Sequence, residues 1–361
     1  MAKDDRRTMV LALLVVVIIA VPVVVFASMQ NDNSNPTSST VDSDALGRMV
    51  NVTSFARVVS CAPDITETVY AMGHGDDLVG VTTFCDFPQD VLDRKVAGTL
   101  TEIGGYWDPS IEQIVDLEPN LVLISSGVQT HLALIDRLEA KNISVVAFYP
   151  GKNLDEVFTN IDIMGQVFND AKKASQLTAE MSSNMNKIKA ITSVHTIKPK
   201  VLFAVWLDPL YTTGGATYVS DIITGAGGTN VFGYLTGWPQ PSMEKVVEVQ
   251  PDYIIVSGTM MLMTPEQIIE SMHNDPIWGQ TPAVKTGHVY VVAGQAENCF
   301  LRQGVRMVDA MHLLAEILFP NDFSADVPNT IGSEYQNYLT PLPDYASGGM
   351  TMLTPMAMTQ V

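Results

Sequence analysis

Short runs of β-branched and aliphatic residues alternate along the chain with segments whose apolar residues recur every three or four positions. In the first half, elements are expected in turn at Arg57–Ser60, Ile65–Met72, Leu78–Val81, Ser110–Leu117, Leu121–Ile124, His131–Ala140 and Ser144–Ala147. The alternation restarts later, at Val201–Val205, Val219–Gly225, Met243–Val249, Tyr253–Val256, Pro265–His273, Val289–Val292 and Gly304–Leu318. This pattern is typical of β-α-β units with helices on both faces of a mostly parallel sheet. The sequence therefore predicts an α/β protein with two Rossmann-like lobes.

Two helices are expected between the halves. Leu154–Phe168 has a helical period, and Asn169-Asp170 then offers a cap for a second, long amphipathic helix that runs to about Ile191. We expect an N-terminal lobe at 57–169, a connecting helix at 170–192, a C-terminal lobe at 198–320 and a partly ordered tail at 321–361.

The two halves share a repeated unit. Ser110–Ile124 combines a capped helix, a Pro-Asn turn and a buried strand, and Ser242–Val256 repeats this order with a Pro-Asp turn. The repeat predicts the same supersecondary unit in each lobe. The alternative is that two unrelated segments converged on the same helix-turn-strand pattern.

The N-terminal end has the pattern of a membrane segment. Residues 1–8 are basic, and the uninterrupted apolar run Met9–Ala27 is long enough to cross a bilayer core of about 30 Å. Basic residues before the run place the bulk of the chain outside the cytoplasm. We expect an uncleaved anchor, with a cleaved signal peptide as the alternative. Residues 28–56 are rich in Ser, Asn, Thr and Asp and are expected to form a flexible linker.

Composition excludes several classes of function. The chain has 39 acidic and 20 basic side chains, a net charge of −19 that argues against a nucleic-acid partner. Cys61, Cys85 and Cys299 form no closely spaced pair, so neither a disulfide scaffold nor a zinc ribbon is indicated. The sequence lacks a nucleophile elbow, a Walker loop and an H-E-x-x-H helix, and its histidines occur singly. We therefore expect no enzyme, cofactor or metal site.

Aromatic side chains gather where predicted strands end. They occur in the segments Thr83–Pro88, Gly104–Pro109, Trp206–Tyr211 and Tyr234–Pro241. Open α/β sheets place ligands at this edge, and aromatic rings on polar loops suit a flat, partly apolar ligand. For any single ring, packing into a lobe core is the alternative.

At this point the chain resembles the cobalamin and iron-siderophore binding proteins that serve ABC importers. The resemblance extends from about Arg57 to Pro320. It rests on Arg57–Ser60 with Ala62–Glu67, Leu78–Val81 with Asp86–Pro88, Ile111–Ile114 with Glu118–Val122, and Gly227–Val231. The resemblance implies two lobes joined by one long rigid helix, with a ligand held between them. It also implies an extracytoplasmic monomer that delivers this ligand to a permease and its ATPase.

The resemblance assigns roles to individual residues. The family's permease-docking glutamates match Glu112 and Glu244, one in each lobe. Its corrin-contacting aromatics match Phe84, Tyr106 and Trp238, with Trp107, Trp206 and Tyr211 as neighbours. The chain departs from the family at Glu297-Asn298-Cys299, where the family has a further polar or aromatic cluster before its last helix. Glu297 and Arg302, which lie near the predicted cleft, are included in the expected ligand-binding set.

The charges expected near the cleft limit the classes of ligand that it can hold. A tricatecholate ferric complex is trianionic and would need arginine or lysine around it, because burying unpaired charge costs several kcal/mol or more. The aromatic segments named above contain no basic residue, and only Arg302 and Arg306 are expected near the cleft. We therefore expect a corrinoid first, then a hydroxamate-type iron chelate or haem.

Two other functions remain open from sequence. A tetrapyrrole metal chelatase would need a histidine and a carboxylate to converge, with His131 and either Glu297 or Asp108 as the candidates. A purely structural surface protein is the other, which an aromatic-lined cleft would disfavour.

Overall fold

The computed structural model describes residues 38–259 and 261–343. The expected basic end and the apolar run at 9–27 lie outside these residues, as does the end of the tail. Within the described residues, no helix combines the length and the apolar character needed to cross a bilayer.

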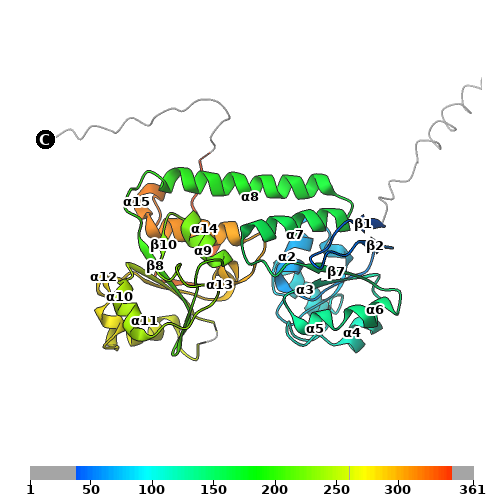
Figure 1. The fold of residues 1–361 in the computed structure, drawn as a ribbon, viewed down its shortest axis with the longest axis horizontal. Coiled ribbons are helices and arrows are strands. Elements are labelled where there is room, and N and C mark those ends of the chain that lie inside the picture. The colour runs from blue at the N-terminus through cyan, green and yellow to red at the C-terminus, as the bar shows by residue number, and fades with distance from the viewer. Residues whose placement is uncertain (1–37, 260, 344–361) are drawn as a thin grey trace, which may run out of the picture. The chain divides into compact units, whose positions relative to one another are not determined.

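The N-terminal lobe is built on a five-stranded parallel sheet with the order β5-β4-β3-β6-β7 (Figure 1). Its strands are β3 (Val58–Ser60), β4 (Leu78–Val81), β5 (Thr101–Glu102), β6 (Leu121–Ser125) and β7 (Ser144–Phe148). Its helices are α2 (Pro63–Ala71), α3 (Gln89–Ala97), α4 (Ile111–Asp116), α5 (Gln129–Leu132), α6 (Ile135–Glu139) and α7 (Leu154–Val167).

Both faces of this sheet are buried, as its uninterrupted apolar strands predict. Leu121 and Leu123 of β6 belong to one apolar core, whereas Val122 and Ile124 belong to another. Successive side chains of a strand point to opposite faces, so one short strand supplies both cores.

The C-terminal lobe repeats this plan. Its sheet has the order β10-β8-β11-β12-β13, all parallel, and β9 pairs antiparallel with β8. The strands are β8 (Lys200–Leu207), β9 (Leu210–Thr212), β10 (Thr229–Asn230), β11 (Tyr253–Ser257), β12 (Val289–Val292) and β13 (Thr330–Ile331). The helices are α9 (Tyr218–Gly225), α10 (Met243–Val249), α11 (Pro265–Asn274), α12 (Pro282–Thr286), α13 (Gly294–Leu301), α14 (Met307–Leu318) and α15 (Pro320–Phe323).

One long helix, α8 (Ala171–Thr192), connects the lobes, in the interval where the sequence placed it. Its first N–H groups are capped by Asp170, whose carboxylate accepts from Lys173 N at 2.9 Å. The helix packs on α7 and on α14 and α9 of the C-terminal lobe (Figure 1). Met181 and Ile188 on its buried face belong to the same core as strand residues of both sheets. This shared core opposes independent movement of the lobes.

The repeated unit has the same backbone in both lobes. Helix α4 leads into β6 and helix α10 into β11, and the residue before each proline, Glu118 or Gln250, has a left-handed φ of 47° or 48°. The register also repeats, since Asn120 N donates to Arg57 O at 2.9 Å and Asp252 N donates to Lys200 O at 2.8 Å.

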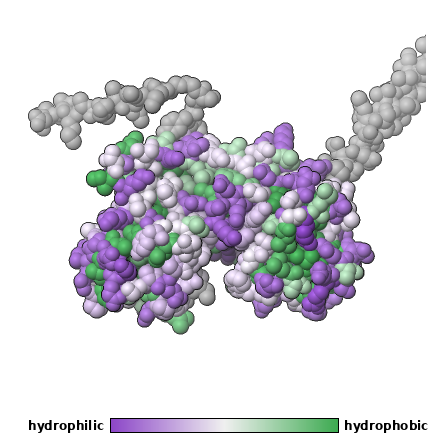
Figure 2. Space-filling view, viewed as in Figure 1, coloured by the Kyte–Doolittle hydropathy of each residue, from purple (hydrophilic) through white to green (hydrophobic). Residues whose placement is uncertain are grey.

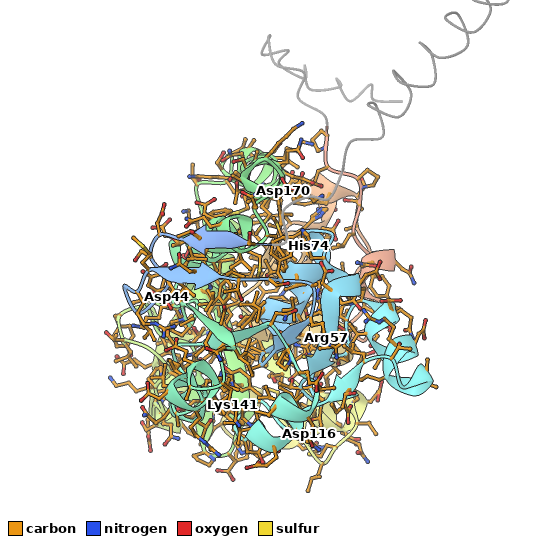
Figure 3. The ribbon with its side chains drawn as sticks, turned by 90° about the vertical axis from the view of Figure 1, so that its right-hand side faces the viewer. Asp44, Arg57, His74, Asp116, Lys141 and Asp170 are labelled. Atoms are coloured by element: carbon orange, nitrogen blue, oxygen red, sulfur yellow. The ribbon has the colours of Figure 1, made fainter. Side chains whose placement is uncertain are left out.

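The expected flexible linker is wrong for residues 38–56. These residues form an antiparallel pair, β1 (Ser39–Val41) and β2 (Val50–Val52), packed against α7 and β7. The fully buried Asp44 lies beside this pair (Figure 3) and binds Arg48 at 2.7 Å. Three valines and one half-buried ion pair fix the segment, and its polar composition concealed them.

The expected boundary at Pro320 is also displaced. Strand β13 lies within the interval assigned to the tail and adds a parallel edge strand to the C-terminal sheet beside β12. Farther on, Thr340 donates through its N–H and its hydroxyl to the buried Glu316 of α14, each at 2.6 Å. The lobe therefore includes residues well beyond 320.

Candidate functional site

The surface is indented between the two lobes (Figure 2). We define the interlobe cleft by five residues that meet there: Asp64, Tyr106, Tyr218, Trp238 and Gln303. Tyr106 and Trp238 were predicted from the sequence as ligand-binding residues, whereas Asp64, Tyr218 and Gln303 were not.

The N-terminal side of the cleft carries a cluster of three rings. Tyr106 packs edge-on against Trp107 with ring centroids 4.6 Å apart. Gly105 lies against the ring of Phe84, since a Cβ there would stand 3.5 Å from Phe84 Cε2. Phe84 is 56% exposed and Trp107 is 66% exposed, so both present large apolar surfaces to solvent. The structure thus brings together the three aromatic residues predicted for this lobe.

His131 is hydrogen-bonded to the loop that carries Tyr106. Its Nδ1 accepts from Ser125 N at 3.1 Å, and its Nε2 donates to Tyr106 O at 2.7 Å. Burial lowers the pKa of His131, which keeps the ring neutral and the tautomer fixed. The histidine is a positioning residue for the Tyr106 loop.

The C-terminal side of the cleft is formed by Tyr218 and Trp238, whose ring centroids are 5.9 Å apart. Tyr218 begins α9, capped by Thr217, and its hydroxyl donates to Leu301 O at 2.9 Å. Burial raises the pKa of Tyr218 first, and the nearby Asp64 and Tyr106 of the other lobe raise it further. Tyr218 therefore packs on the predicted Trp238 and lies near enough to the predicted Tyr106 for an electrostatic effect.

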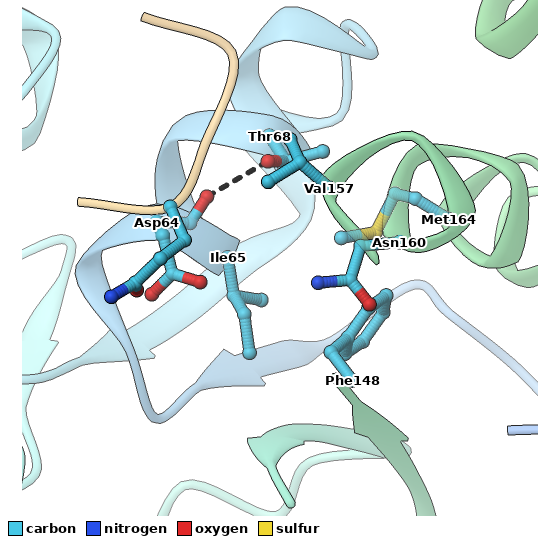
Figure 4. A pocket seen from close by; sticks show the side chains of 8 residues that line it. Asp64, Ile65, Thr68, Phe148, Val157, Asn160 and Met164 are labelled. Atoms are coloured by element: carbon cyan, nitrogen blue, oxygen red, sulfur yellow. Dashed lines mark hydrogen bonds between the residues drawn. The ribbon is translucent and has the colours of Figure 1, made fainter. Parts of the chain in front are cut away.

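The floor of the cleft is a segment of the C-terminal lobe in contact with the N-terminal lobe. Gln303 packs against Gly151, and a Cβ added at Gly304 would stand 3.5 Å from Asp64 O. A small hollow of about 10 Å³ remains between Gln303, Asp64 and helix α7. Figure 4 shows Asp64 and Ile65 at the first turn of α2 on one side of this hollow, with Asn160 and Met164 on the other.

Beside the floor, two arginines cross to the N-terminal lobe. Glu67 Oε1 lies 2.8 Å from Arg302 and 2.5 Å from Arg306, and Asp86 Oδ1 lies 2.6 Å from Arg302. Arg306 also stacks on the ring of Phe87 at 3.9 Å. Arg302, expected to bind ligand, is thus already neutralised by two carboxylates.

Asp64 is a third carboxylate near these ion pairs, and neither Arg302 nor Arg306 forms an ion pair with it. Burial raises its pKa to about 6, and Glu67 raises it too, whereas its own and Ile65's backbone N–H groups and Arg302 lower it. Asp64 in turn raises the pKa of Tyr106, which burial above all brings to about 12. The cleft floor is therefore acidic and hydrogen-bonding in character.

Replacing Asp64 with asparagine should raise the Tm at pH 7.5. The folded-state pKa of about 6 lies above the ordinary 3.8, so the carboxyl costs stability progressively as the pH rises from about 4 to about 6, and the full cost is present above about pH 6. Glu67, Arg302, Tyr106 and Tyr218 are the titratable groups that face it. The gain should shrink on acidification and vanish below about pH 4, as thermal unfolding across pH would show.

The matched control is Asp136→Asn, on the exposed surface of α6. An Asp64→Asn gain in Tm that stays constant from pH 4 to 7.5 would contradict this reading.

The other predicted ligand residues lie apart from the ring cluster. Trp206 and Tyr211 face each other across the β8–β9 hairpin, and Trp206 borders a hollow of about 380 Å³ with Met261, Leu262 and Met263. Glu297 is buried in the C-terminal lobe, where its carboxylate accepts from Ser257 Oγ and from Thr259 N at 3.3 Å. Burial raises its pKa, and Ser257 opposes that shift.

Glu112 and Glu244 occupy equivalent positions in the repeated unit. Each lies in the first turn of its helix, α4 or α10, where a negative charge is favoured, and each is exposed. Glu112 is 78% exposed, 3.7 Å from Arg137, and borders a surface hollow of about 340 Å³. The hydroxyl of Ser242 lowers the pKa of Glu244.

The chelatase pairing of His131 with Glu297 is not formed, and neither ring nitrogen of His131 is free to pair with Asp108. Both ring nitrogens of His131 bind backbone groups of the N-terminal lobe, and Glu297 is bonded inside the other lobe. Across residues 38–259 and 261–343, no cluster of three or more His, Cys, Asp and Glu side chains is arranged to hold a metal ion. Cys61, Cys85 and Cys299 are free and buried.

The sequence did not single out Asp64, Tyr218 or Gln303 as site residues. Asp64 lies within the Ala62–Glu67 motif at the start of α2, and Tyr218 follows a glycine-containing loop. Both signals mark a helix N-terminus after a strand, the position that commonly faces ligands in open α/β sheets.

Known proteins are similar to this chain over both lobes. Residues 58–296 match the family model described as periplasmic binding protein. An uncharacterized ABC transporter substrate-binding lipoprotein of Bacillus subtilis, YvrC, is 31% identical over 271 residues, covering 74% of this chain and 81% of that protein. A vitamin B12-binding protein of Yersinia pseudotuberculosis is 30% identical over 205 residues, covering 56% of this chain and 70% of that protein.

Solved structures show the same fold. The crystal structure of a possible iron-binding (periplasmic solute-binding) protein from Staphylococcus epidermidis aligns with a TM-score of 0.63 and 26% identity. The alignment covers 73% of this chain and 98% of that structure.

Proposed function

Because the chain belongs to the periplasmic binding protein family, we propose that it captures a neutral, corrinoid-like ligand in the interlobe cleft and delivers it to an ABC permease. The similarity to a vitamin B12-binding protein and to an ABC transporter substrate-binding lipoprotein supports this proposal. The protein binds and releases its ligand without making or breaking a bond.

One observation carries the choice of ligand. Arg302 and Arg306, the cations expected near the cleft, both bind Glu67, and Arg302 also binds Asp86. Freeing them for an anionic ligand would leave buried carboxylates unpaired, at a cost of several kcal/mol. A neutral macrocycle needs no such exchange and gains from the surfaces of Phe84, Tyr106 and Trp238.

An iron chelate or haem is the alternative ligand. The similarity to the possible iron-binding protein of Staphylococcus epidermidis favours it, and a hydroxamate-type chelate carries less charge than a tricatecholate complex. The exposed rings would stack on haem as well, so the discrimination rests on charge.

The placement of the protein follows from its N-terminal pattern. Basic residues at 1–8 followed by the apolar run Met9–Ala27 support an anchor, or a cleaved signal, with both lobes outside the cytoplasm. There the lobes act as a monomer and dock through Glu112 and Glu244 on a permease that is driven by its ATPase.

Titration with cyanocobalamin should quench the intrinsic tryptophan fluorescence of the protein in a saturable way. Trp238 lies in the cleft and Trp107 at its edge, and both should transfer energy to a bound corrin that absorbs in the near ultraviolet. The Trp238→Phe variant should lose part of the quench, whereas Trp278→Phe, at a site 5% exposed outside the cleft residues, should keep it. No quench and no heat of binding would refute the corrinoid as ligand, and haemin tested in parallel would assess the alternative.

A further inference from the structure

The charges at the cleft floor do not balance. Three carboxylates, Asp64, Glu67 and Asp86, lie with two guanidinium groups, Arg302 and Arg306. This cluster therefore has one negative charge in excess when all five groups are ionised.

The excess falls on Asp64. Both oxygens of Glu67 accept from arginine, with Oε2 bound to Arg306 Nε at 2.8 Å, and Asp86 accepts from Arg302. The carboxylate of Asp64 accepts from backbone N–H groups at the start of α2, and Arg302 acts on it only through space. Reorienting Arg302 toward Asp64 would break its bonds to Glu67 and Asp86.

Asp64 is half-buried and lies where the two lobes meet. Asp64 lines the floor hollow with Gln303, and its backbone is in contact with Gly304 of the opposite lobe. It acts electrostatically on Tyr106 and Tyr218, one on each side of the cleft. A ligand held in the cleft would meet the half-buried rings of Tyr106 and Trp238, the amide of Gln303 and one carboxylate, whereas Tyr218 is 4% exposed and its hydroxyl already donates to Leu301 O.

We propose that Asp64 determines specificity by selecting a macrocycle whose peripheral groups are carboxamides over one of the same shape that carries a carboxylate. This inference rests on the proposed function. A carboxamide N–H donates a charge-assisted hydrogen bond to Asp64, which is stronger than a bond between neutral groups. A ligand carboxylate at the same place faces a like charge and offers no donor, so the residue favours one ligand and disfavours the other.

The test compares ligands that differ in a single group. Cyanocobalamin and the three monocarboxylic acids formed by hydrolysing one of its propionamide groups are titrated calorimetrically at pH 7.5. The wild-type protein should bind at least one of the acids about tenfold or more weakly than cyanocobalamin. Asp64→Asn keeps the shape and removes the charge, and should bring that ratio to within about threefold.

Asp136→Asn serves as the control, because Asp136 is exposed on α6 and its loss leaves the cleft charges unchanged. If cyanocobalamin binds but the ratio is the same in wild-type and Asp64→Asn proteins, the role of Asp64 is refuted while the proposed function stands. If the wild-type protein binds none of the four corrinoids, the proposed ligand fails and the inference fails with it.

Discussion

Replacing Glu67 with glutamine is expected to lower the free energy of unfolding by about 3–5 kcal/mol, the usual effect of removing one partner from a buried ion pair. Glu67 is 3% exposed and Arg306 is 5% exposed, so the guanidinium would be left desolvated without its anion. Burial alone would lower the pKa of Arg306, and Glu67 more than offsets that effect. Urea unfolding at pH 7 should show the loss as a lower midpoint with an unchanged slope.

The control for this variant is Glu102→Gln. Glu102 is half exposed and pairs with Lys95 at 3.0 Å, so its loss should cost less than about 1 kcal/mol. A Glu67→Gln protein as stable as Glu102→Gln would show that the pairs between the lobes contribute little. In that case the argument that Arg302 and Arg306 are unavailable to a ligand would weaken as well.

Elements whose signals are local were predicted well from the sequence. Strands β4 and β12 have the predicted bounds, Leu78–Val81 and Val289–Val292. Both are apolar runs between turn residues, and burial on both faces of a parallel sheet leaves little choice of conformation. The repeated unit was predicted for the same reason, since its cap, turn and strand lie within 15 consecutive positions.

Elements that depend on distant partners were missed. Strand β13 has two residues, Thr330 and Ile331, and exists because Val291 and Val292 offer it an edge. Strand β1 depends on α7, where Ser39 Oγ donates to Val167 O at 2.6 Å across 128 residues of sequence. Two or three residues show no period, so a sequence pattern cannot reveal them.

The same difference between local signals and distant partners applies to the candidate site. The ring cluster of Phe84, Tyr106 and Trp107 was expected because aromatic residues on loops at strand ends form a local signal. The commitment of Arg302 was not, because its partners Glu67 and Asp86 precede it by 235 and 216 residues. Electrostatic partners over such distances are set by the fold, which brings α2 of one lobe to the segment after α13 of the other.

Reversing the charge of both Glu112 and Glu244 is expected to abolish ligand uptake while leaving ligand affinity unchanged. The two carboxylates occupy the same turn of equivalent helices, one in each lobe, and both are exposed. Partner arginines on a permease would bind them as a spaced pair, which orients the complex and speeds encounter. The Glu112→Lys, Glu244→Lys protein should therefore bind cyanocobalamin normally in calorimetry but lower transport in reconstituted vesicles by at least tenfold.

The contrast that gives this experiment meaning is a second pair with the same change of charge. Glu180 on α8 and Glu270 on α11 are also exposed, one on the connecting helix and one in the C-terminal lobe. Glu180→Lys with Glu270→Lys adds the same four positive units, so equal losses in the two proteins would attribute the effect to net charge. Normal transport in the Glu112→Lys, Glu244→Lys protein would remove the docking role.

Reversing one glutamate at a time should distinguish the contributions of the two lobes to docking. Glu112 lies 3.7 Å from Arg137, which partly neutralises its charge in the free protein. If Arg137 competes with the permease, Arg137→Ala should speed complex formation, whereas the Glu244 side should be unaffected.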